Sequence, residues 1–377
     1  MNARDLSEIR SRLTPDDQNL ACIRGCFVSS RKEIVSMFRL SPFSMGNEEY
    51  EKYISLFRKV LSGVPEKNLV QIAFADGDVG QGDAHKLLMA LREDALEDDG
   101  LAEVLFHRLI DGMEEGESFL ILLAYDAYDV PFRDGGMRTE DGGTVMFRYI
   151  LCAVCPVRLS KPSLVYSPQD RLFHPEEVNW TVGAPETGFM FPAFEDRGAD
   201  IYHAMFYSRD PSGDNTALVQ AAFEASPPMA AEEQKEAFRE ILETSLQEDC
   251  SLEVMQTVHE RLCEQIAQQK QDKQAPPAKV SAPQIRQALE VCGVSPDKVA
   301  DFEDRYRQQF GGGMDASAVN VVDPRRFEVR TPNVVIRVDP ARSDLVETRV
   351  IDGSRYILIR ADEGVEVNGI NVSIMPL

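Results

Sequence analysis

The chain has 377 residues, 43% of them hydrophobic, and its 40 Lys and Arg against 63 Asp and Glu give a net charge of −23. This length and apolar content suffice for two or three domains with ordinary hydrophobic cores. The negative charge repels nucleic acids and anionic membranes at long range, which disfavours non-specific binding to either. A local basic patch still acts within a Debye length of about 10 Å.

Targeting and membrane segments are not expected. Residues 1–6 contain no apolar stretch typical of a secretory signal. The most apolar stretches, 119–125 and 149–157, are much shorter than the roughly 20 residues that a membrane helix needs. An odd number of cysteines, seven, favours reduced thiols over a disulfide framework. We therefore expect a cytoplasmic protein with no membrane anchor.

The first half of the chain predicts a mixture of helices and strands. Apolar periodicity predicts helices at 5–13, 47–61, 84–94 and 101–113, and strands at 23–29, 68–74, 118–126 and 145–157. Residues 160–185 are rich in proline and predict irregular structure. A β-hairpin is expected at 188–208, turning at 195–198. Because the elements do not alternate as β-α-β units, the order predicts an α+β fold with a mixed sheet.

A linker is expected in the second half. Helices are predicted from Asp214, over 230–247 and over 251–271, and the last one runs into a polar stretch that ends at Pro276-Pro277. Such a stretch has no apolar face and is typical of a linker. The predicted organisation is an α+β body with a helical end at 1–266, a linker at 267–281 and a C-terminal module at 282–377.

The C-terminal module is expected to combine helices with a small β-sheet. Two short helices are predicted at 282–292 and 296–310, followed by strands at 326–330, 334–338, 345–351, 356–360 and 365–372. The dipeptides Asp352-Gly353 and Asn368-Gly369 are typical of tight hairpin turns, which need positive φ angles.

The cysteine pair Cys152 and Cys155 has the CxxC spacing of redox and metal sites. Such sites need the pair on a turn or at a helix start, whereas this pair lies inside an apolar strand. Residues i and i+3 of a strand point to opposite faces. We expect buried structural cysteines here and at Cys22 and Cys26, although the four could still meet across adjacent strands.

His259 and Cys263 lie one helical turn apart, which is a metal-ligand spacing. His259 belongs to an apolar helical stripe with Met255 and Leu262, so a core histidine is favoured. The glycine-rich stretches 77–82 and 311–313 lack the Gly-Lys-Ser/Thr of a phosphate-binding loop. The sequence therefore predicts no metal and no cofactor.

Two pairs of aspartates are the candidate catalytic residues. Asp126 and Asp129 end an apolar strand, and Asp196 and Asp200 lie on the later hairpin near His203. Carboxylates that converge can hold Mg²⁺ or act as acid and base, as in a metal-dependent hydrolase. The alternative is that aspartates at strand ends form turns and solvated loops. With 63 acidic residues, clusters arise by chance, which favours the alternative.

Arginine is the only basic residue type between residues 323 and 360. Arginine forms paired hydrogen bonds with carboxylates and phosphates. The candidates for binding an anionic partner are Arg326, Arg330, Arg337, Arg349 and Arg355. The alternative is cross-strand pairing with the acids Glu328, Glu347 and Asp339 on a solvated face.

Several segments carry a family resemblance. The stretches 124–131, 149–162, 188–194, 344–353 and 366–372 are similar to those of the DUF4317 family, an uncharacterised bacterial family. The resemblance spans essentially the whole chain and implies no activity, cofactor or site residue. The layout of strands, helices and an arginine-bearing β unit also resembles the bacterial nucleoid-associated protein family, which implies a DNA-linked role.

The leading hypothesis is a non-enzymatic cytoplasmic binding or regulatory protein with a protein partner. One alternative is a DNA-linked protein acting through the C-terminal module, which the net charge disfavours because DNA affinity depends on neutralising phosphates. The other alternative is a metal-dependent hydrolase that uses Asp126 and Asp129.

Overall fold

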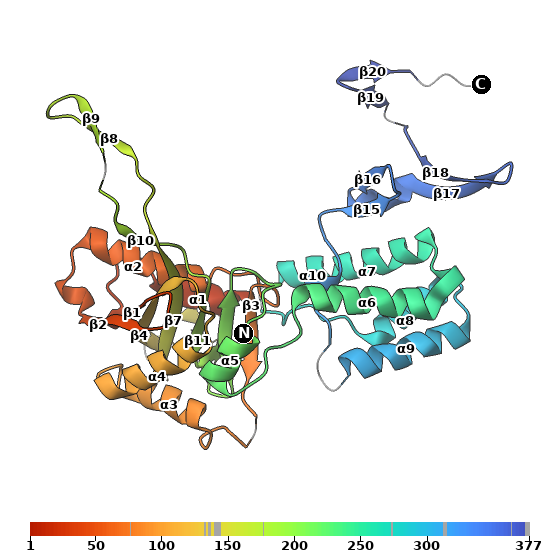
Figure 1. Ribbon diagram of the computed structural model, residues 1–377. Helices are drawn as coiled ribbons and strands as arrows, with labels where there is room; N and C mark the ends of the chain where they lie inside the picture. Colours follow the sequence, from red (N-terminus) through yellow and green to blue (C-terminus); the bar gives the residue numbers. More distant parts are fainter. Residues whose placement is uncertain are drawn as a thin grey trace. The chain divides into compact units, whose positions relative to one another are not determined.

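The computed structural model describes the chain except residues 76, 132, 135–136, 139–144, 176, 273, 312–314, 363 and 374–377. Its residues form two compact units, Met1–Ala230 (unit 1) and Ala231–Leu377 (unit 2), and Figure 1 shows the elements of each. The linker expected at 267–281 falls inside unit 2. Part of the 311–313 glycine stretch lies outside the described residues.

Unit 1 is built on an eight-stranded sheet. Its strand order is β2 (Ile34–Leu40), β1 (Leu20–Val28), β4 (Ser118–Val130), β7 (Val145–Leu159), β11 (Thr187–Phe191), β14 (His203–Ser208) and β3 (Leu69–Ala73), with β10 (Trp180–Val182) beside the end of β7. All these pairings are antiparallel. The sheet therefore differs from the mixed sheet that the sequence predicted. The α+β class is confirmed.

Helices cover both faces of this sheet. One hydrophobic cluster contains the buried residues of α1 (Ala3–Arg12) and α2 (Asn47–Val60); the other contains those of α3 (Asp83–Glu93), α4 (Asp99–Asp111) and α5 (Thr216–Phe223). Along β4, Leu122 belongs to the first cluster and Leu123 to the second. A strand buried on both faces needs a continuous apolar run, which explains the composition of β4 and β7.

The cysteines of β7 follow the same alternation. Cys152 packs in the cluster with α3–α5, and Cys155 packs in the cluster with α1 and α2. Burial raises the pKa of both thiols, that of Cys155 to about 12. The prediction of buried structural cysteines on opposite faces is confirmed.

Hairpins extend from unit 1. The expected hairpin turn at 195–198 is confirmed by β12 (Ala193–Glu195) and β13 (Gly198–Asp200), while β5 (Arg133–Asp134) pairs with β6 (Met137–Arg138). The expectation of irregular structure at 160–185 is wrong, because β8 (Leu164–Ser167) pairs there with β9 (Leu172–Pro175). Pro168 lies in the turn and Pro175 at the end of β9, where the missing N–H breaks no ladder.

Unit 2 contains a helical core and three hairpins. The helices are α6 (Ala231–Leu246), α7 (Leu252–Gln271), α8 (Ala282–Val291), α9 (Pro296–Phe310) and α10 (Ala318–Val321). The hairpins pair β15 (Phe327–Arg330) with β16 (Val335–Val338), β17 (Val346–Ile351) with β18 (Ser354–Ile359), and β19 (Val365–Val367) with β20 (Ile370–Val372). The short 3₁₀ helices of the chain are η1 (Pro42–Ser44), η2 (Gln247–Asp249) and η3 (Pro340–Leu345).

Aromatic packing joins the helices of unit 2, where Phe238 of α6 contacts Phe302 and Tyr306 of α9. The turns predicted at Asp352-Gly353 and Asn368-Gly369 are confirmed, since all four residues have positive φ angles. Over the described part of the chain, no helix is both long and apolar enough to cross a membrane.

Candidate functional site

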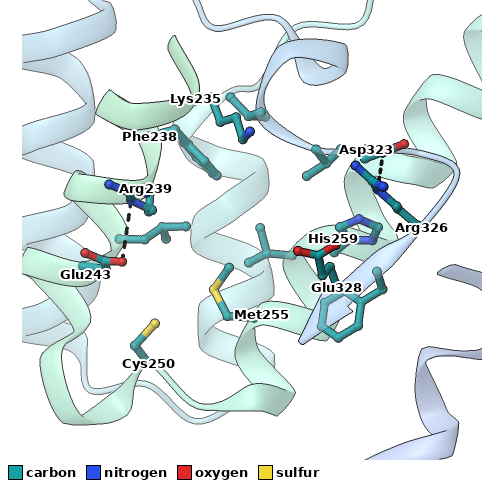
Figure 2. Close-up of a pocket in the computed structure, with 15 residues that line it drawn as sticks. Lys235, Phe238, Arg239, Glu243, Cys250, Met255, His259, Asp323, Arg326 and Glu328 are labelled. Atoms are coloured by element: carbon teal, nitrogen blue, oxygen red, sulfur yellow. Dashed lines mark ion pairs between the residues drawn. The ribbon is translucent and has the colours of Figure 1, made fainter. Parts of the chain in front are cut away.

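Unit 2 contains a cavity of about 500 Å³ (Figure 2). Its walls come from α6, from α7 and from the segment 321–328 that leads into β15. Small-molecule sites in proteins typically enclose about 300–1,000 Å³. The cavity is therefore large enough for a metabolite-sized ligand.

Helical periodicity places the lining residues on common faces. Residues of α6 line the cavity at spacings of three and four, which is one helical face: Lys235, Phe238, Arg239, Leu242 and Glu243. On α7 the lining residues Met255, Val258 and His259 repeat the same spacing. The lining faces of α6 and α7 and the segment 321–328 together enclose the cavity, although they lie far apart in the sequence.

The cavity has an apolar interior and a charged rim. Phe238, Leu242, Val258 and Phe327 are buried and supply the apolar surface. The exposed charged residues of the lining are Lys235, Arg239, Glu243, Asp323 and Arg326. A site of this kind buries an apolar body and keeps a polar end near water.

Charges at the rim are balanced. Arg326 Nε lies 2.9 Å from an Asp323 carboxylate oxygen, and Arg239 Nε lies 3.8 Å from Glu243 Oε1. Figure 2 marks both pairs with dashed lines. Such exposed pairs are weak and are easily rearranged. The rim therefore favours a neutral or zwitterionic ligand over one with a large net charge.

His259 is the buried ionisable residue of the lining. Its ring packs edge-on against Phe327, with centroids 5.2 Å apart, and its Nδ1 lies 3.5 Å from Cys263 Sγ. Burial lowers the pKa of His259, although backbone groups of Asp323 and Arg326 oppose this effect. The ring is therefore neutral near pH 7, and the predicted core histidine is confirmed.

The thiols near the cavity are not activated. Burial raises the pKa of Cys250, which lines the cavity, and raises that of Cys263 to about 11. A nucleophilic cysteine needs a lowered pKa and a nearby cation. Among the described lining residues, the geometry thus provides packing surface and hydrogen-bonding groups but no activated nucleophile.

Asp126, the first predicted aspartate, lies in unit 1, and both of its oxygens accept hydrogen bonds. It is 1% exposed, and its two oxygens accept hydrogen bonds from Arg12 Nε at 2.7 Å and Arg12 Nη2 at 2.9 Å. The Tyr149 hydroxyl donates a third bond at 2.6 Å, and the Arg12 guanidinium lies 4.4 Å from the centre of the Tyr128 ring. This cluster ties the end of α1 to β4 and β7.

The other predicted aspartates lie apart from this cluster. Asp129 is exposed on β4, and Asp196 is exposed in the β12–β13 turn. Asp200 lies near Glu195 and His203, with ligand atoms within 4.8 Å of one another, a set with metal-ligand chemistry. Among the described residues, neither Asp126, Asp129 nor Asp196 belongs to that set.

The predicted arginines are mostly paired with acids. Arg337 faces Glu328 across the β15–β16 ladder at 2.9 Å, and Arg330 binds the same carboxylate at 2.7 Å. Arg349 pairs with Glu347 at 3.1 Å. Arg326 is also paired, with Asp323, and lines the cavity. Only Arg355 differs, being exposed with no acid at ion-pair distance among the described residues.

The cavity face of α6 was not predicted from the sequence. Its signal was present, because the charged residues Lys235, Arg239 and Glu243 flank the apolar Phe238 and Leu242 on one side of the helix. A surface helix normally keeps its charges away from its apolar stripe. Charged residues beside the apolar stripe indicate that the stripe packs against its neighbours only in part. The sequence of α6 alone does not show that α7 and the segment 321–328 face it.

The family model described as "Domain of unknown function (DUF4317)" matches residues 1–370. Neither a curated protein nor a solved structure matches the chain.

Proposed function

The chain belongs to the DUF4317 family, whose description names no activity, and we propose from the site geometry that it is a non-enzymatic binding protein whose unit 2 takes a small, largely apolar molecule. The observation that carries this proposal is the cavity of about 500 Å³ with its apolar interior and charged rim. The ligand places an apolar body against Phe238, Leu242 and Phe327, and a neutral or zwitterionic polar end at the rim.

Binding fits the site better than catalysis. General acid–base and nucleophilic catalysis need a group whose pKa is tuned to the working pH, or a nucleophile beside a base. In the lining, His259 is neutral and packed, and Cys250 keeps its proton. Both oxygens of the Asp126 carboxylate in unit 1 already accept hydrogen bonds from Arg12 or Tyr149, and Arg12 balances its charge.

The cysteines support a reducing compartment such as the cytoplasm. All seven are free, and four of them are buried on strands of unit 1. Secreted proteins usually oxidise their cysteines to disulfides.

The test uses the fluorescent amphipathic probe 8-anilinonaphthalene-1-sulfonate and the full-length chain. Met255 points into the cavity (Figure 2), so Met255→Trp fills part of it. We expect saturable binding to the wild type and at least a roughly tenfold weaker affinity for the variant, because each 1.4 kcal/mol of lost contact is tenfold.

The matched control is Val291→Trp, a substitution of an exposed apolar residue on α8 that does not line the cavity. This control keeps wild-type affinity. Equal affinity of Met255→Trp and wild type, with both variants folded, would show that the cavity is not the binding site.

A further inference from the structure

Unit 1 brings together three side chains that can bind a metal ion, at the β12–β13 hairpin and the start of β14. Glu195, Asp200 and His203 each offer one ligand atom, and these atoms all lie within 4.8 Å of one another. Among the described residues, no other group of three or more metal-ligating side chains meets this closely. The cluster belongs to unit 1, so it is not part of the cavity, which lies within unit 2.

The pairing of the hairpin explains why its two carboxylates converge. Glu195 is opposite Gly198, and Ala193 is opposite Asp200. Residues two apart on a strand share a face, so Glu195 and Asp200 are diagonal neighbours on one face. Gly198 lies on the same face and has no side chain to separate them. After a short turn the chain begins β14 with His203, which completes the cluster.

Hydrogen bonds hold the cluster and its hairpin in place. His203 Nδ1 lies 2.6 Å from Asp200 Oδ2, and the Tyr202 N–H donates to Asp200 Oδ1 at 3.0 Å. The hairpin turn is fixed from outside the cluster, because Arg197 donates two hydrogen bonds to the Glu8 carboxylate, at 2.9 and 3.1 Å. Ligands that are positioned in advance lose little conformational freedom when they bind.

Negative charge accumulates around the hairpin. Burial raises the pKa of the Asp5 carboxyl, and the charges of Glu8 and Glu195 raise it further against an opposing backbone N–H and the N-terminal ammonium. That ammonium, on Met1, lies 3.7 Å from Glu195 Oε1, but Glu195 stays 47% exposed. Ion pairs open to solvent are weak. A divalent cation held between the carboxylates therefore reduces their mutual repulsion.

The donor set selects the class of ion. Zinc and similar transition metals accept one imidazole nitrogen together with two carboxylates, whereas magnesium and calcium prefer oxygen ligands alone. An imidazole has two nitrogens, so His203 can carry its proton on Nε2 and present Nδ1 to a metal. Three protein ligands leave one position of a tetrahedral zinc ion for water or an external ligand.

We propose that Glu195, Asp200 and His203 form a binding site for a divalent transition-metal ion such as Zn²⁺. The ion ties the β12–β13 hairpin to the start of β14. It binds in unit 1, so the site exists whether or not the cavity of unit 2 takes a ligand.

The test is calorimetric titration of the full-length chain with Zn²⁺ and, separately, with Mg²⁺. We expect zinc affinity at least about tenfold weaker in Glu195→Gln and in His203→Ala, because even groups that only orient metal ligands contribute about 10–100-fold. Mg²⁺ binds more weakly than Zn²⁺ to the wild type, since it gains little from the imidazole. The seven cysteines also attract zinc, but every sample contains them, so the difference between variants isolates this site.

The matched control is His107→Ala, which removes an exposed histidine of α4 that lies 3.8 Å from a single carboxylate, Glu103. This control keeps wild-type affinity. Melting temperatures measured without metal show that the variants fold, and the isosteric Glu195→Gln decides the question if His203→Ala does not. A Glu195→Gln titration that superimposes on that of the wild type, an equal loss in the control, or Mg²⁺ binding as tight as Zn²⁺ binding overturns the inference.

Discussion

Asp126 in unit 1 and His259 in unit 2 are both buried ionisable residues, yet their surroundings differ in kind. The Asp126 carboxylate accepts hydrogen bonds from Arg12 and Tyr149, and this cluster fixes α1 on the sheet. His259 packs against Phe327, contacts Cys263 Sγ and lines the cavity. A buried charge with all its bonds satisfied supports structure, whereas a neutral ring beside empty space leaves room for a ligand.

Asp126 and His259 belong to different compact units, Met1–Ala230 and Ala231–Leu377. Truncating the chain tests whether unit 2 folds by itself, and we expect it to change unfolding more than any substitution does. We expect the fragment 231–377 to unfold cooperatively by circular dichroism, and the fragment 282–377 to show no cooperative transition. The shorter fragment lacks α6, so Phe302 and Tyr306 lose their contact with Phe238. It also loses the hydrogen bond from Lys298 Nζ to the Leu246 carbonyl. Cooperative unfolding of 282–377 would favour the boundary at 267–281 that the sequence predicts.

The second test disrupts the cluster of Arg12, Asp126 and Tyr149. Arg12→Met leaves the Asp126 carboxylate buried without its counter-charge, which costs about 3–5 kcal/mol of unfolding free energy. Urea denaturation measures this loss. The matched control Arg10→Met lies on the same helix and changes stability by less than about 0.5 kcal/mol, as surface substitutions do. A cost of Arg12→Met close to that of the control would mean that the pair is not structural and would return Asp126 to the candidate catalytic residues.

Local patterns predicted the central strands of unit 1 well. The apolar runs of β4 and β7 indicated burial on both faces, and the spacing of Cys152 and Cys155 predicted their opposite faces. Both conclusions depend only on the two-residue period of a strand. The edge strand β2 was missed because its side chains are largely exposed and its pairing with β1 decides its structure.

Contacts between distant residues could not be predicted in the same way. Asp126 and Arg12 are 114 positions apart, so nothing local distinguished an ion pair from a metal ligand. The cavity likewise requires α6, α7 and the segment 321–328 to converge, which is a property of tertiary packing. The β8–β9 hairpin was not predicted, because prolines indicated irregular structure there. Pro168 lies in its turn and Pro175 at the end of β9, where they do not prevent the pairing.

The third test sharpens the description of His259 through its pH dependence. Burial sets the folded pKa of His259 below its unfolded value of about 6.5. Its contribution to stability is therefore complete above pH 6.5 and is lost as the pH falls towards the folded pKa. Between pH 7.5 and 5 we expect the wild type to lose more unfolding free energy than His259→Leu, because protonation of the buried ring favours the unfolded chain. Parallel urea titrations measure this difference, and identical pH profiles would mean that the ring is not held neutral.

The smallest effect is expected for the exposed arginines of the unit 2 hairpins. They do not pack in a hydrophobic core and, unlike Arg326, they do not line the cavity. Arg337→Gln removes an ion pair with Glu328 and lowers the melting temperature by about 1 °C or less, because exposed pairs contribute little. Arg355→Gln removes no ion pair with any residue that the structure describes, and it leaves the melting temperature unchanged. The Arg337 effect vanishes in a Glu328→Gln background and at high salt, where surface charges are screened. A larger loss of melting temperature from Arg355→Gln than from Arg337→Gln would show that Arg355 contacts a partner. The hairpins of unit 2 would then be a second binding surface beside the cavity.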